Sequence, residues 1–333
     1  MATRWGIVSA GLISNDFVGA LKALPEGEHR VVAVAARSLE SAKKFASKYG
    51  VEKAYGSYDE LARDPNVEVV YIGTIQTQHL PVASLMIQAG KHVLCEKPLC
   101  MNVKEVKQLI QLAKEKKVFL MEAVWSRFFP VYQELTRRIQ SGEIGDVVQV
   151  ICSFGKSIED VTRMVRRETG GGATLDLGLY TVQFTTLVMG GDKPQKVLAC
   201  GHLNDNGVDE TISTSLVYSG RRVASLSSTI RGDLPSEGFV IGTKGTIKVN
   251  YPMWAPESLE SSSGKYESLL PKTGHIFNFE NSQGLMYEAV EVRRCLNEGL
   301  LESPVMTHKE SLTNAEVMEK MRTQVGVKFD QDD

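Results

Sequence analysis

Residues 1–122 alternate short apolar runs with segments in which apolar residues recur at helical spacing, and no other feature constrains the fold as strongly. A run such as Val31–Ala35, apolar at every position, is typical of a strand buried on both faces of a parallel sheet. A segment such as Leu39–Tyr49 is typical of an amphipathic helix that covers such a sheet. The alternation predicts a doubly wound α/β domain. The other predicted strands are Trp5–Ser9, Val67–Ile72, Val93–Cys95 and Val118–Glu122, and the other predicted helices are Asn15–Leu24, Tyr58–Leu61, Pro81–Ala89 and Val103–Glu115.

Beyond residue 122 the pattern changes to longer runs in which apolar and polar residues alternate. This period of two predicts antiparallel strands with two different faces, and Gly242–Gly245 predicts a hairpin turn. The length of 333 residues favours two hydrophobic cores. We therefore expect a C-terminal α+β domain, residues 123–333, built on a large, open, mostly antiparallel sheet. Its strands are predicted within Val147–Phe154, Val197–Leu203, Thr211–Tyr218, Val223–Ile230 and Phe239–Asn250, its helices within Thr174–Met189, Leu285–Glu298 and Glu310–Val325, and a surface loop at Ser258–Ser263.

Composition argues against several classes of partner. A net charge of −2, with 23% charged residues, offers no basic surface for a nucleic acid. The apolar runs are far shorter than the roughly 18 residues of a membrane span, and the N-terminal residues enter a strand rather than a signal peptide. Five scattered cysteines without metal-ligand spacing predict reduced thiols and no metal site. We expect a cytoplasmic protein with neither a membrane nor a nucleic acid as partner.

The first predicted strand runs into Ser9–Ser14, a degenerate dinucleotide-binding turn in which serines replace the first and third glycines. Gly11 would let a pyrophosphate approach the backbone, and the helix after the turn would direct its amide dipole at the phosphates. Ser9, Leu12 and Ile13 are the other predicted cofactor contacts in this turn. A turn without a ligand is the alternative, because any parallel domain contains strand-to-helix turns. The position of this turn before the first helix favours a cofactor.

The second predicted strand ends at Arg37 and Ser38, where an NAD enzyme would offer a carboxylate to the adenosine ribose. Arginine can stack on adenine and pair with a 2′-phosphate, and serine adds a hydroxyl donor. The predicted cofactor is therefore NADP. The alternative is that Arg37 is a solvated charge at a helix start.

Ligands of doubly wound sheets bind beyond the carboxyl ends of the strands. Thr74, Gln76 and His79 follow the strand that ends at Ile72, and we predict that they contact the ribose and phosphates of the cofactor. For His79 the alternative is a helix-start histidine without a ligand. Tyr71 either packs in the core or reaches the cofactor.

A lysine, an aspartate and a tyrosine are the candidate catalytic groups. Lys97 stands in a Glu-Lys-Pro motif at the end of an apolar run, where an ammonium needs water, a ligand or a counter-charge. Asp176 and Tyr180, at positions i and i+4 of a predicted helix after a glycine run, share one helical face with Cβ atoms roughly 5–6 Å apart. Gly178 between them lets another group approach. The alternatives are a surface charge for Lys97 and a half-buried core phenol for Tyr180.

These motifs resemble the Gfo/Idh/MocA oxidoreductase family, whose marks are the Glu-Lys-Pro motif and an Asp-x-Gly-x-His helix. Here the second motif is Asp176–Tyr180, and tyrosine replaces the family's usual histidine. That tyrosine, together with Trp125–Pro130 and Trp5–Ser14, resembles family members that oxidise trans-dihydrodiols of arenes. The resemblance covers nearly the whole chain and implies a Rossmann domain with NADP held partly by Glu96 and Lys97.

The activity implied by the resemblance is NADP-dependent oxidation of trans-1,2-dihydrobenzene-1,2-diol to catechol, and of D-xylose to D-xylono-1,5-lactone. Both reactions remove a hydride from a carbinol carbon. One alternative is another sugar or inositol dehydrogenase of the same family. The other is a non-catalytic NADP-binding regulator, against which the presence of Lys97, Asp176 and Tyr180 argues.

Oxidation of a carbinol needs a base for the hydroxyl proton, and a phenol with a pKa near 10 is mostly protonated at neutral pH. Lys97 within about 4–6 Å would favour the phenolate of Tyr180, and it could also hold the nicotinamide ribose. Asp176 is predicted to orient the substrate and the lysine. Aromatic side chains would line a pocket for a flat ring, although each could equally belong to a core. The predicted substrate contacts are Trp125, Arg127, Phe154, Asp176, Tyr180, Trp254 and Phe279, with Arg166 and Arg167 as further polar candidates.

The C-terminal sheet has enough predicted helices to cover only one of its faces. An uncovered apolar face of that size favours a second subunit as its cover. We expect a homodimer formed through this sheet.

Overall fold

The computed structural model describes every residue from Met1 to Asp333 and divides the chain into two compact units. The prediction drew one boundary, between residues 122 and 123, whereas the chain passes between the units several times. Residues 270–308, predicted as part of the C-terminal domain, belong with the N-terminal residues. The first unit consists of Met1–Cys100, Lys104–Trp125 and Leu270–His308, and the second of Met101–Val103, Ser126–Leu269 and Lys309–Asp333.

The first unit is built on a parallel sheet of six strands in the order β3-β2-β1-β4-β5-β6. This confirms the predicted doubly wound domain. All predicted strands are present, and the short edge strand β3 was missed. The strands are β1 Thr3–Val8, β2 His29–Ala35, β3 Lys53–Tyr55, β4 Val69–Ile72, β5 His92–Glu96 and β6 Leu120–Ala123, and the helices are α1 Leu12–Leu21, α2 Leu39–Tyr49, α3 Tyr58–Ala62, α4 His79–Gln88, α5 Val103–Lys116 and α8 Leu285–Asn297.

The order of the strands places β1 beside both β2 and β4, so the chain reverses its direction of winding at β1. At such a switch point the loops after the two neighbouring strands diverge and leave a crevice for a ligand. The turn after β1 and the loop after β4 are therefore the expected borders of a nucleotide site.

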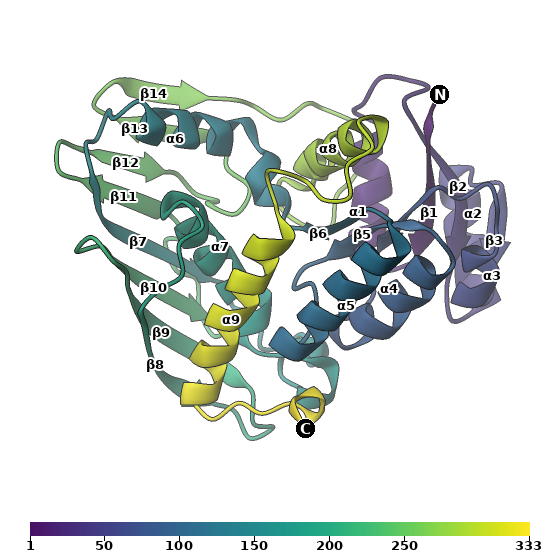
Figure 1. Cartoon of the computed structure of the whole chain (residues 1–333). Helices are drawn as coiled ribbons and strands as arrows, with labels where there is room; N and C mark the ends of the chain where they lie inside the picture. Colours follow the sequence, from purple (N-terminus) through teal and green to yellow (C-terminus); the bar gives the residue numbers. More distant parts are fainter. The chain divides into compact units, whose positions relative to one another are not determined.

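Residues 270–308 join the first unit through helix α1. Helix α8 packs against α1 (Figure 1). Before it, the backbone N–H groups of Asn278 and Phe279 donate to the carboxylate of Asp16, each at 2.9 Å, and Asp16 is fully buried. The ring of His275 lies so close to Gly19 that a Cβ there would stand 2.2 Å from it. The hydrogen bonds to buried Asp16 and the close contact with Gly19 explain why this segment belongs to the first unit and not to the C-terminal domain predicted for it.

The second unit is built on a mixed sheet of eight strands in the order β14-β13-β12-β11-β7-β10-β9-β8 (Figure 1). Only the pair β7 and β10 is parallel, which confirms the mostly antiparallel sheet. The strands are β7 Val147–Gly155, β8 Lys196–Leu203, β9 Asp209–Val217, β10 Val223–Thr229, β11 Gly238–Gly242, β12 Thr246–Val249, β13 Ser258–Ser261 and β14 Gly264–Glu267, and the helices are α6 Pro130–Gln140, α7 Leu179–Val188 and α9 His308–Gln324.

The predicted surface loop at Ser258–Ser263 was wrong. Residues 258–261 form β13, which makes a hairpin with β14 and pairs with β12. Serines have a weak strand preference, but Leu259 is fully buried and the backbone ladder needs no particular side chains. Helix α6, which packs on this end of the sheet, was also missed.

One face of this sheet carries helices and the other carries none of them. Helices α6 and α7 pack against strands β7, β10 and β12–β14. Away from those helices, side chains such as Ile151 and Leu198 are 43% and 59% exposed. The edge strand β8 is closed by the amide of Gln324, which accepts from the N–H of Ala199 at 2.8 Å and donates to the carbonyl of Val197 at 2.9 Å. The side-chain amide thus satisfies edge groups that would otherwise pair with another strand.

Candidate active site

The turn after β1 has the backbone of a dinucleotide-binding turn although its first glycine is missing. Ser9 adopts a φ of 81°, a left-handed conformation that costs a non-glycine residue roughly 1–2 kcal/mol. Gly11 is the N-cap of α1, and no side chain caps the helix. A Cβ on Gly11 would lie 3.4 Å from Ser9 Oγ and 3.7 Å from the Gly73 carbonyl, both ordinary contact distances. The first-turn amides of α1, which include those of Leu12 and Ile13, are thereby available to a phosphate.

The third glycine of the turn is replaced by Ser14, and a glycine on the neighbouring loop compensates for it. Ser14 is fully buried, and a Cβ on Gly73 would lie 2.4 Å from its Oγ. The close approach of α1 to the end of β4 therefore requires glycine at position 73. Sequence reasoning did not identify this role of Gly73.

The residues predicted to recognise the adenosine lie at the start of α2. Arg37 is exposed, and its positive charge acts on the phenol of Tyr58. Ser38 is the N-cap of α2, and its hydroxyl accepts from the N–H of Ser41 at 3.4 Å. Ser38 therefore has a capping role, and Arg37 is the group with a charge to offer a 2′-phosphate.

His79 has a different role from the predicted cofactor contact. The ring is buried, with Nδ1 at 2.8 Å from the carbonyl of Pro98 and Nε2 at 3.1 Å from the carbonyl of Thr74. Burial lowers the pKa of His79 below its usual value, and the two carbonyls oppose that shift. Because each ring nitrogen contacts a backbone carbonyl, His79 links the loop after β4 to the turn after β5. The Thr74 Oγ1 remains buried without a protein partner, as a cofactor contact would be, and Gln76 is buried nearby in the same loop.

Tyr71 belongs to the core, which decides between its two predicted roles. Its ring is fully buried and stacks on Phe17 with centroids 3.9 Å apart. The Tyr71 hydroxyl donates to Glu96 Oε1 at 2.6 Å, and the N–H of Lys97 donates to Glu96 Oε2 at 3.2 Å. Burial, followed by the charge of Glu96, raises the Tyr71 pKa well above its usual value. Glu96 therefore holds the backbone of Lys97, and Tyr71 holds Glu96.

In the second unit, Asp176 and Tyr180 begin the helical segment that packs on the sheet. Residues Thr174–Gly178 form a π-helical turn that continues into α7, where an uninterrupted α-helix was predicted. Single π-helical turns often occur at functional sites. The turn is capped by Asp209, which accepts from the N–H and hydroxyl of Thr174 at 2.7 and 2.6 Å, and burial raises the pKa of Asp209 to about 6.

The glycine run before this turn is packed rather than flexible. Gly172 has a φ of 116°, and a Cβ there would lie 2.4 Å from the Asp209 carboxylate. A Cβ on Gly171 would lie 2.5 Å from the carbonyl of Met164. The glycines therefore bring the start of the helix close to two neighbouring segments, which holds Asp176 and Tyr180 in place.

Asp176 is paired with a cation that sequence reasoning did not select. Arg163 Nη2 lies 3.1 Å from Asp176 Oδ2, and the Asp176 side chain is 10% exposed. The prediction named Arg166 and Arg167 as polar candidates, but Arg166 is exposed and Arg167 pairs with Asp330. Arg163 lies in a single 3₁₀ turn, Thr162–Met164, which is too short to give a periodic sequence pattern.

Three of the predicted substrate residues come together in the second unit. The rings of Phe154 and Trp254 stack in parallel with centroids 4.0 Å apart, and Phe154 meets Tyr180 edge to face at 5.5 Å. Lys156 Nζ lies 5.4 Å above the Trp254 ring. All three aromatic side chains are 5–6% exposed. Phe154 and Trp254 thus form an apolar wall beside the Tyr180 phenol.

The other predicted substrate residues have different surroundings. Arg127 is a buried structural cation, with Nε at 2.7 Å from Gln183 Oε1 and Nη1 at 2.8 Å from Glu310 Oε1. The Arg127 guanidinium is therefore bound by partners within the second unit. The predicted contact of Arg127 with the substrate is replaced by this structural role. Phe279 and Trp125 belong to the first unit. Phe279 is 45% exposed there, and Trp125 is buried.

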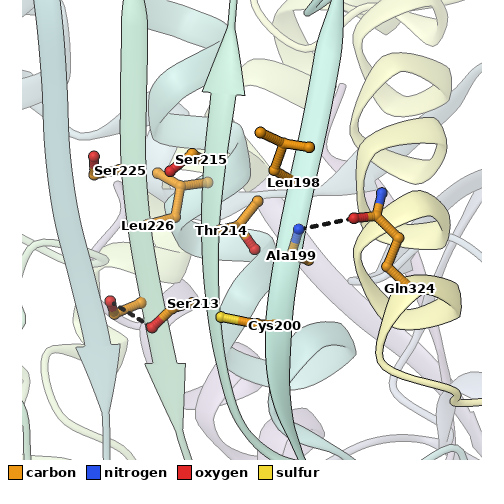
Figure 2. A pocket seen from close by; sticks show the side chains of 10 residues that line it. Leu198, Ala199, Cys200, Ser213, Thr214, Ser215, Ser225, Leu226 and Gln324 are labelled. Carbon is orange, nitrogen blue, oxygen red and sulfur yellow. Dashed lines mark hydrogen bonds between the residues drawn. The ribbon is translucent and has the colours of Figure 1, made fainter.

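A shallow concavity of about 410 Å³ lies on the helix-free face of the second unit's sheet (Figure 2). Leu198 contributes an exposed apolar side chain to it, and Figure 2 shows the hydrogen bond between Ala199 and Gln324 at its border. Most of its other lining side chains are small and hydroxyl-bearing. None of the predicted catalytic or substrate residues lines it.

Two family models match the chain. One, described as an oxidoreductase family with an NAD-binding Rossmann fold, matches residues 3–124, and the other, a GFO/IDH/MocA C-terminal domain, matches residues 132–248. The chain belongs to the Gfo/Idh/MocA oxidoreductase family. The first unit is therefore the family's NAD(P)-binding Rossmann domain, and the open first turn of α1 fits a dinucleotide. No helix of this family member is long and apolar enough to cross a membrane.

Curated relatives match this Gfo/Idh/MocA chain over its full length. A trans-1,2-dihydrobenzene-1,2-diol dehydrogenase from Xenopus laevis is 50% identical over 99% of the chain and 100% of its own length. The human protein of that name is 46% identical over 100% and 99%. Solved structures share the fold at lower identity. An aldose-aldose oxidoreductase from Caulobacter crescentus has a TM-score of 0.83 at 22% identity, with 96% of each chain covered. A 3-ketoreductase from Actinomadura kijaniata, solved with NADP, has a TM-score of 0.81 at 23% identity, with 99% of each chain covered.

Proposed function

We propose that this protein is an NADP-dependent dehydrogenase that oxidises trans-1,2-dihydrobenzene-1,2-diol to catechol. The observation that carries the proposal is the stacked pair Phe154 and Trp254 beside the Tyr180 phenol, because it offers a flat apolar surface next to a group that can take a proton. Relatives 46–50% identical over the full chain bear the name of that activity. The reaction removes a hydride and a hydroxyl proton from one carbinol, and the resulting hydroxyketone enolises to catechol.

In the proposed mechanism Tyr180 is the base, and Lys97 and Asp176 assist it. Tyr180 accepts the hydroxyl proton from the substrate. Lys97 stabilises the phenolate of Tyr180 and holds the nicotinamide ribose. Asp176 accepts a hydrogen bond from a substrate hydroxyl, and Arg163 compensates its charge at 3.1 Å, so the carboxylate does not act on the phenol as an isolated anion. The bound nicotinamide supplies the hydride acceptor.

NADP is the proposed cofactor because of the residues at the end of β2. Arg37 is exposed there and stands where an NAD enzyme would offer a carboxylate. A guanidinium at this position attracts a 2′-phosphate and has nothing to offer a 2′-hydroxyl as acceptor. The solved 3-ketoreductase of the same fold contains NADP. Contacts from Ser9, Gly11 and Thr74 complete the proposed nucleotide site.

Oxidation of D-xylose to D-xylono-1,5-lactone is the proposed second activity. The ion pair of Asp176 and Arg163 beside Tyr180 favours it, because a polyhydroxylated ring needs both acceptors and donors, and an aromatic wall can also stack on a sugar face. We further propose that the protein acts in the cytoplasm, where its five free cysteines would stay reduced.

Reduced-nicotinamide absorbance with a substrate panel tests the proposed activity. The panel contains trans-1,2-dihydrobenzene-1,2-diol, D-xylose, D-glucose and myo-inositol, each with NADP and with NAD. We expect turnover of the dihydrodiol and of D-xylose, with kcat/KM at least ten times higher for NADP than for NAD, since one lost charge-assisted contact costs about 1.5–3 kcal/mol. Turnover of inositol alone would replace the proposal by an inositol dehydrogenase. Cofactor binding without turnover of any alcohol would favour a regulator.

We also propose a homodimer formed through the helix-free face of the second unit's sheet. Leu198 is 59% exposed on β8 and Ile151 43% exposed on β7. Strands β9 and β10 between them carry serines on that face, so a second sheet could pack closely there. Sedimentation at micromolar concentration should give a dimer for the wild type and a monomer for Leu198→Arg. Val290→Arg, at another exposed apolar side chain on α8, is the matched control and should remain dimeric. A monomeric wild type would count against this interface.

A further inference from the structure

The proposed mechanism uses an ion pair whose two partners lie in short turns. Arg163 belongs to the 3₁₀ turn Thr162–Met164, and Asp176 belongs to the π-helical turn Thr174–Gly178 at the start of α7. An isolated turn, like the first turn of a helix, has too few hydrogen bonds of its own to be fixed in position. Another element must therefore hold both turns for Arg163 Nη2 to lie 3.1 Å from Asp176 Oδ2.

Both turns are bound by the β8–β9 connection, which consists of residues 204–208 and Asp209, the first residue of β9. The connection is closed by hydrogen bonds of its own. The N–H of Asn204 donates to the carbonyl of Val208 at 2.9 Å, and the N–H of Gly207 donates to the carbonyl of Asn204 at 3.0 Å. Asn204 Oδ1 also accepts from the N–H groups of Asn206 and Val208, at 2.9 and 3.2 Å. The connection is therefore a fixed structure to which other segments can attach.

The first attachment holds the segment of Arg163. The carbonyl of Val165, two residues after Arg163, accepts two side-chain hydrogen bonds. Nδ2 of Asn204 donates to it at 3.0 Å, and Nδ2 of Asn206 donates to it at 2.9 Å. The Arg163 turn is thus tied to the β8–β9 connection by the amides of two asparagines.

The second attachment holds the segment of Asp176. Asp209 Oδ2 accepts from the N–H and the hydroxyl of Thr174, two residues before Asp176, at 2.7 and 2.6 Å. Asp209 Oδ1 faces Gly172, where an added Cβ would stand 2.4 Å from it. Asp209 is 1% exposed. Its carboxylate makes charge-assisted hydrogen bonds, which are roughly twice as strong as neutral ones.

We propose that Asp209 and Asn204 are positioning residues of the proposed dehydrogenase: Asp209 sets the place of Asp176 and Tyr180, and Asn204 sets the place of Arg163. This inference rests on the proposed function for the roles of those three side chains. The two attachments serve different steps, because Tyr180 takes the proton of either substrate whereas Arg163 serves the binding of a polyhydroxylated ring. Loss of the Asp209 attachment should therefore lower kcat for both substrates, and loss of the Asn204 attachment should raise KM for D-xylose.

Asp209→Asn tests the second attachment, because asparagine keeps the shape of the side chain and removes its charge. Assays at pH 8 compare it with a wild type in which Asp209 is ionised, since burial raises the pKa of Asp209 to about 6. We expect kcat to fall about tenfold with both substrates and the NADP dissociation constant to stay the same. The Tm should not fall, because an acid with a raised pKa in the fold loses its contribution to stability as pH rises through that pKa. An unchanged kcat, or a fall in Tm of more than about 4 °C, would overturn this role.

Thr174→Val and Thr174→Ser are the conservative pair for the same hydrogen bond. Valine keeps the volume and loses the hydroxyl donor, so kcat should fall as in Asp209→Asn. Serine keeps the donor, and its kcat should stay within about threefold of the wild type. Asp205→Asn removes a carboxylate at an exposed position of the same connection and should leave kcat unchanged. Equal kcat in the valine and serine variants would contradict the positioning role of Asp209.

Asn204→Asp combined with Asn206→Ala, which we call the Asn204 variant, tests the first attachment. Aspartate keeps the Oδ1 acceptor that closes the connection and replaces the Nδ2 donor by an oxygen that repels the carbonyl of Val165. We expect KM for D-xylose to rise about tenfold and kcat for the dihydrodiol to stay within about threefold of the wild type. Equal effects on the two substrates would refute the assignment of Asn204 to Arg163.

Amide hydrogen exchange makes the test independent of turnover. The N–H of Thr174 donates to Asp209, and the N–H of Gly171 donates to the carbonyl of Arg166 at 2.9 Å, so each amide reports one attachment. Exchange should accelerate about tenfold at Thr174 in Asp209→Asn and at Gly171 in the Asn204 variant, and the other amide should not change. Acceleration of both amides by either variant would overturn the division of roles. If the wild type oxidises neither substrate, the proposed function fails, and the exchange pattern still decides whether the two attachments act separately.

Discussion

Replacing Tyr180 by phenylalanine should lower kcat for the dihydrodiol by about 10²–10⁴-fold, the range that a positioned general base contributes. Phenylalanine keeps the edge-to-face contact with Phe154 at 5.5 Å and loses only the hydroxyl, so the fold and cofactor binding should not change. The measurement is steady-state NADPH formation at pH 7, together with the NADP dissociation constant from protein fluorescence.

Tyr251→Phe is the matched control for Tyr180→Phe. Tyr251 also meets the Trp254 ring edge to face, at 5.5 Å, and its hydroxyl accepts from Lys156 rather than serving the proposed reaction. We expect its kcat to stay within about threefold of the wild type, as expected for loss of one exposed hydrogen bond. If Tyr180→Phe retained full kcat, Tyr180 would not be the base.

Replacing Lys97 by methionine should lower kcat by about 10²–10³-fold, the usual cost of removing one group that stabilises developing charge. Without the ammonium, the Tyr180 phenol should titrate closer to its unperturbed pKa of about 10. The remaining activity should therefore rise with pH over a wider range than in the wild type. The measurement is kcat as a function of pH.

Lys107→Met, at an exposed lysine on α5, is the control for the loss of one positive charge, and its pH profile should match that of the wild type. A Lys97→Met profile of unchanged shape, scaled down at every pH, would mean that Lys97 binds the cofactor without acting on the phenol.

The periodicity of the sequence predicted most of the sheet and helix elements because hydrophobic burial determines them locally. Val31–Ala35 is apolar at every position and lies within the buried strand β2, and the alternating run at Val147–Phe154 became β7 with one covered face. The hairpin at Ser258–Glu267 was missed because backbone pairing with β12 decides it rather than side-chain pattern. The position of residues 270–308 was missed because it depends on hydrogen bonds to Asp16, far away in the sequence.

For the site, residue type and spacing identified Asp176, Tyr180, Phe154 and Trp254 as neighbours in the second unit. The same reasoning failed for Arg127, whose charge is used by Gln183 and Glu310. A charged residue that is compensated within the fold cannot be told from one that awaits a ligand until its tertiary partners are known. His79 was predicted to contact the cofactor, and its ring nitrogens lie against two backbone carbonyls. Tyr71 has the core role that was one of its two predicted roles, and Arg163 was overlooked.

The central proposal is that Lys97 and Tyr180 act on the same proton of one substrate. Kinetics of Lys97→Met, Tyr180→Phe and the double variant test it most directly, because groups that act as a unit show strongly non-additive losses. We predict that the double variant loses no more kcat than the more damaged single variant, within about threefold. A double variant whose loss equals the product of the two single losses would show that the ammonium and the phenol work independently, and would contradict the claim.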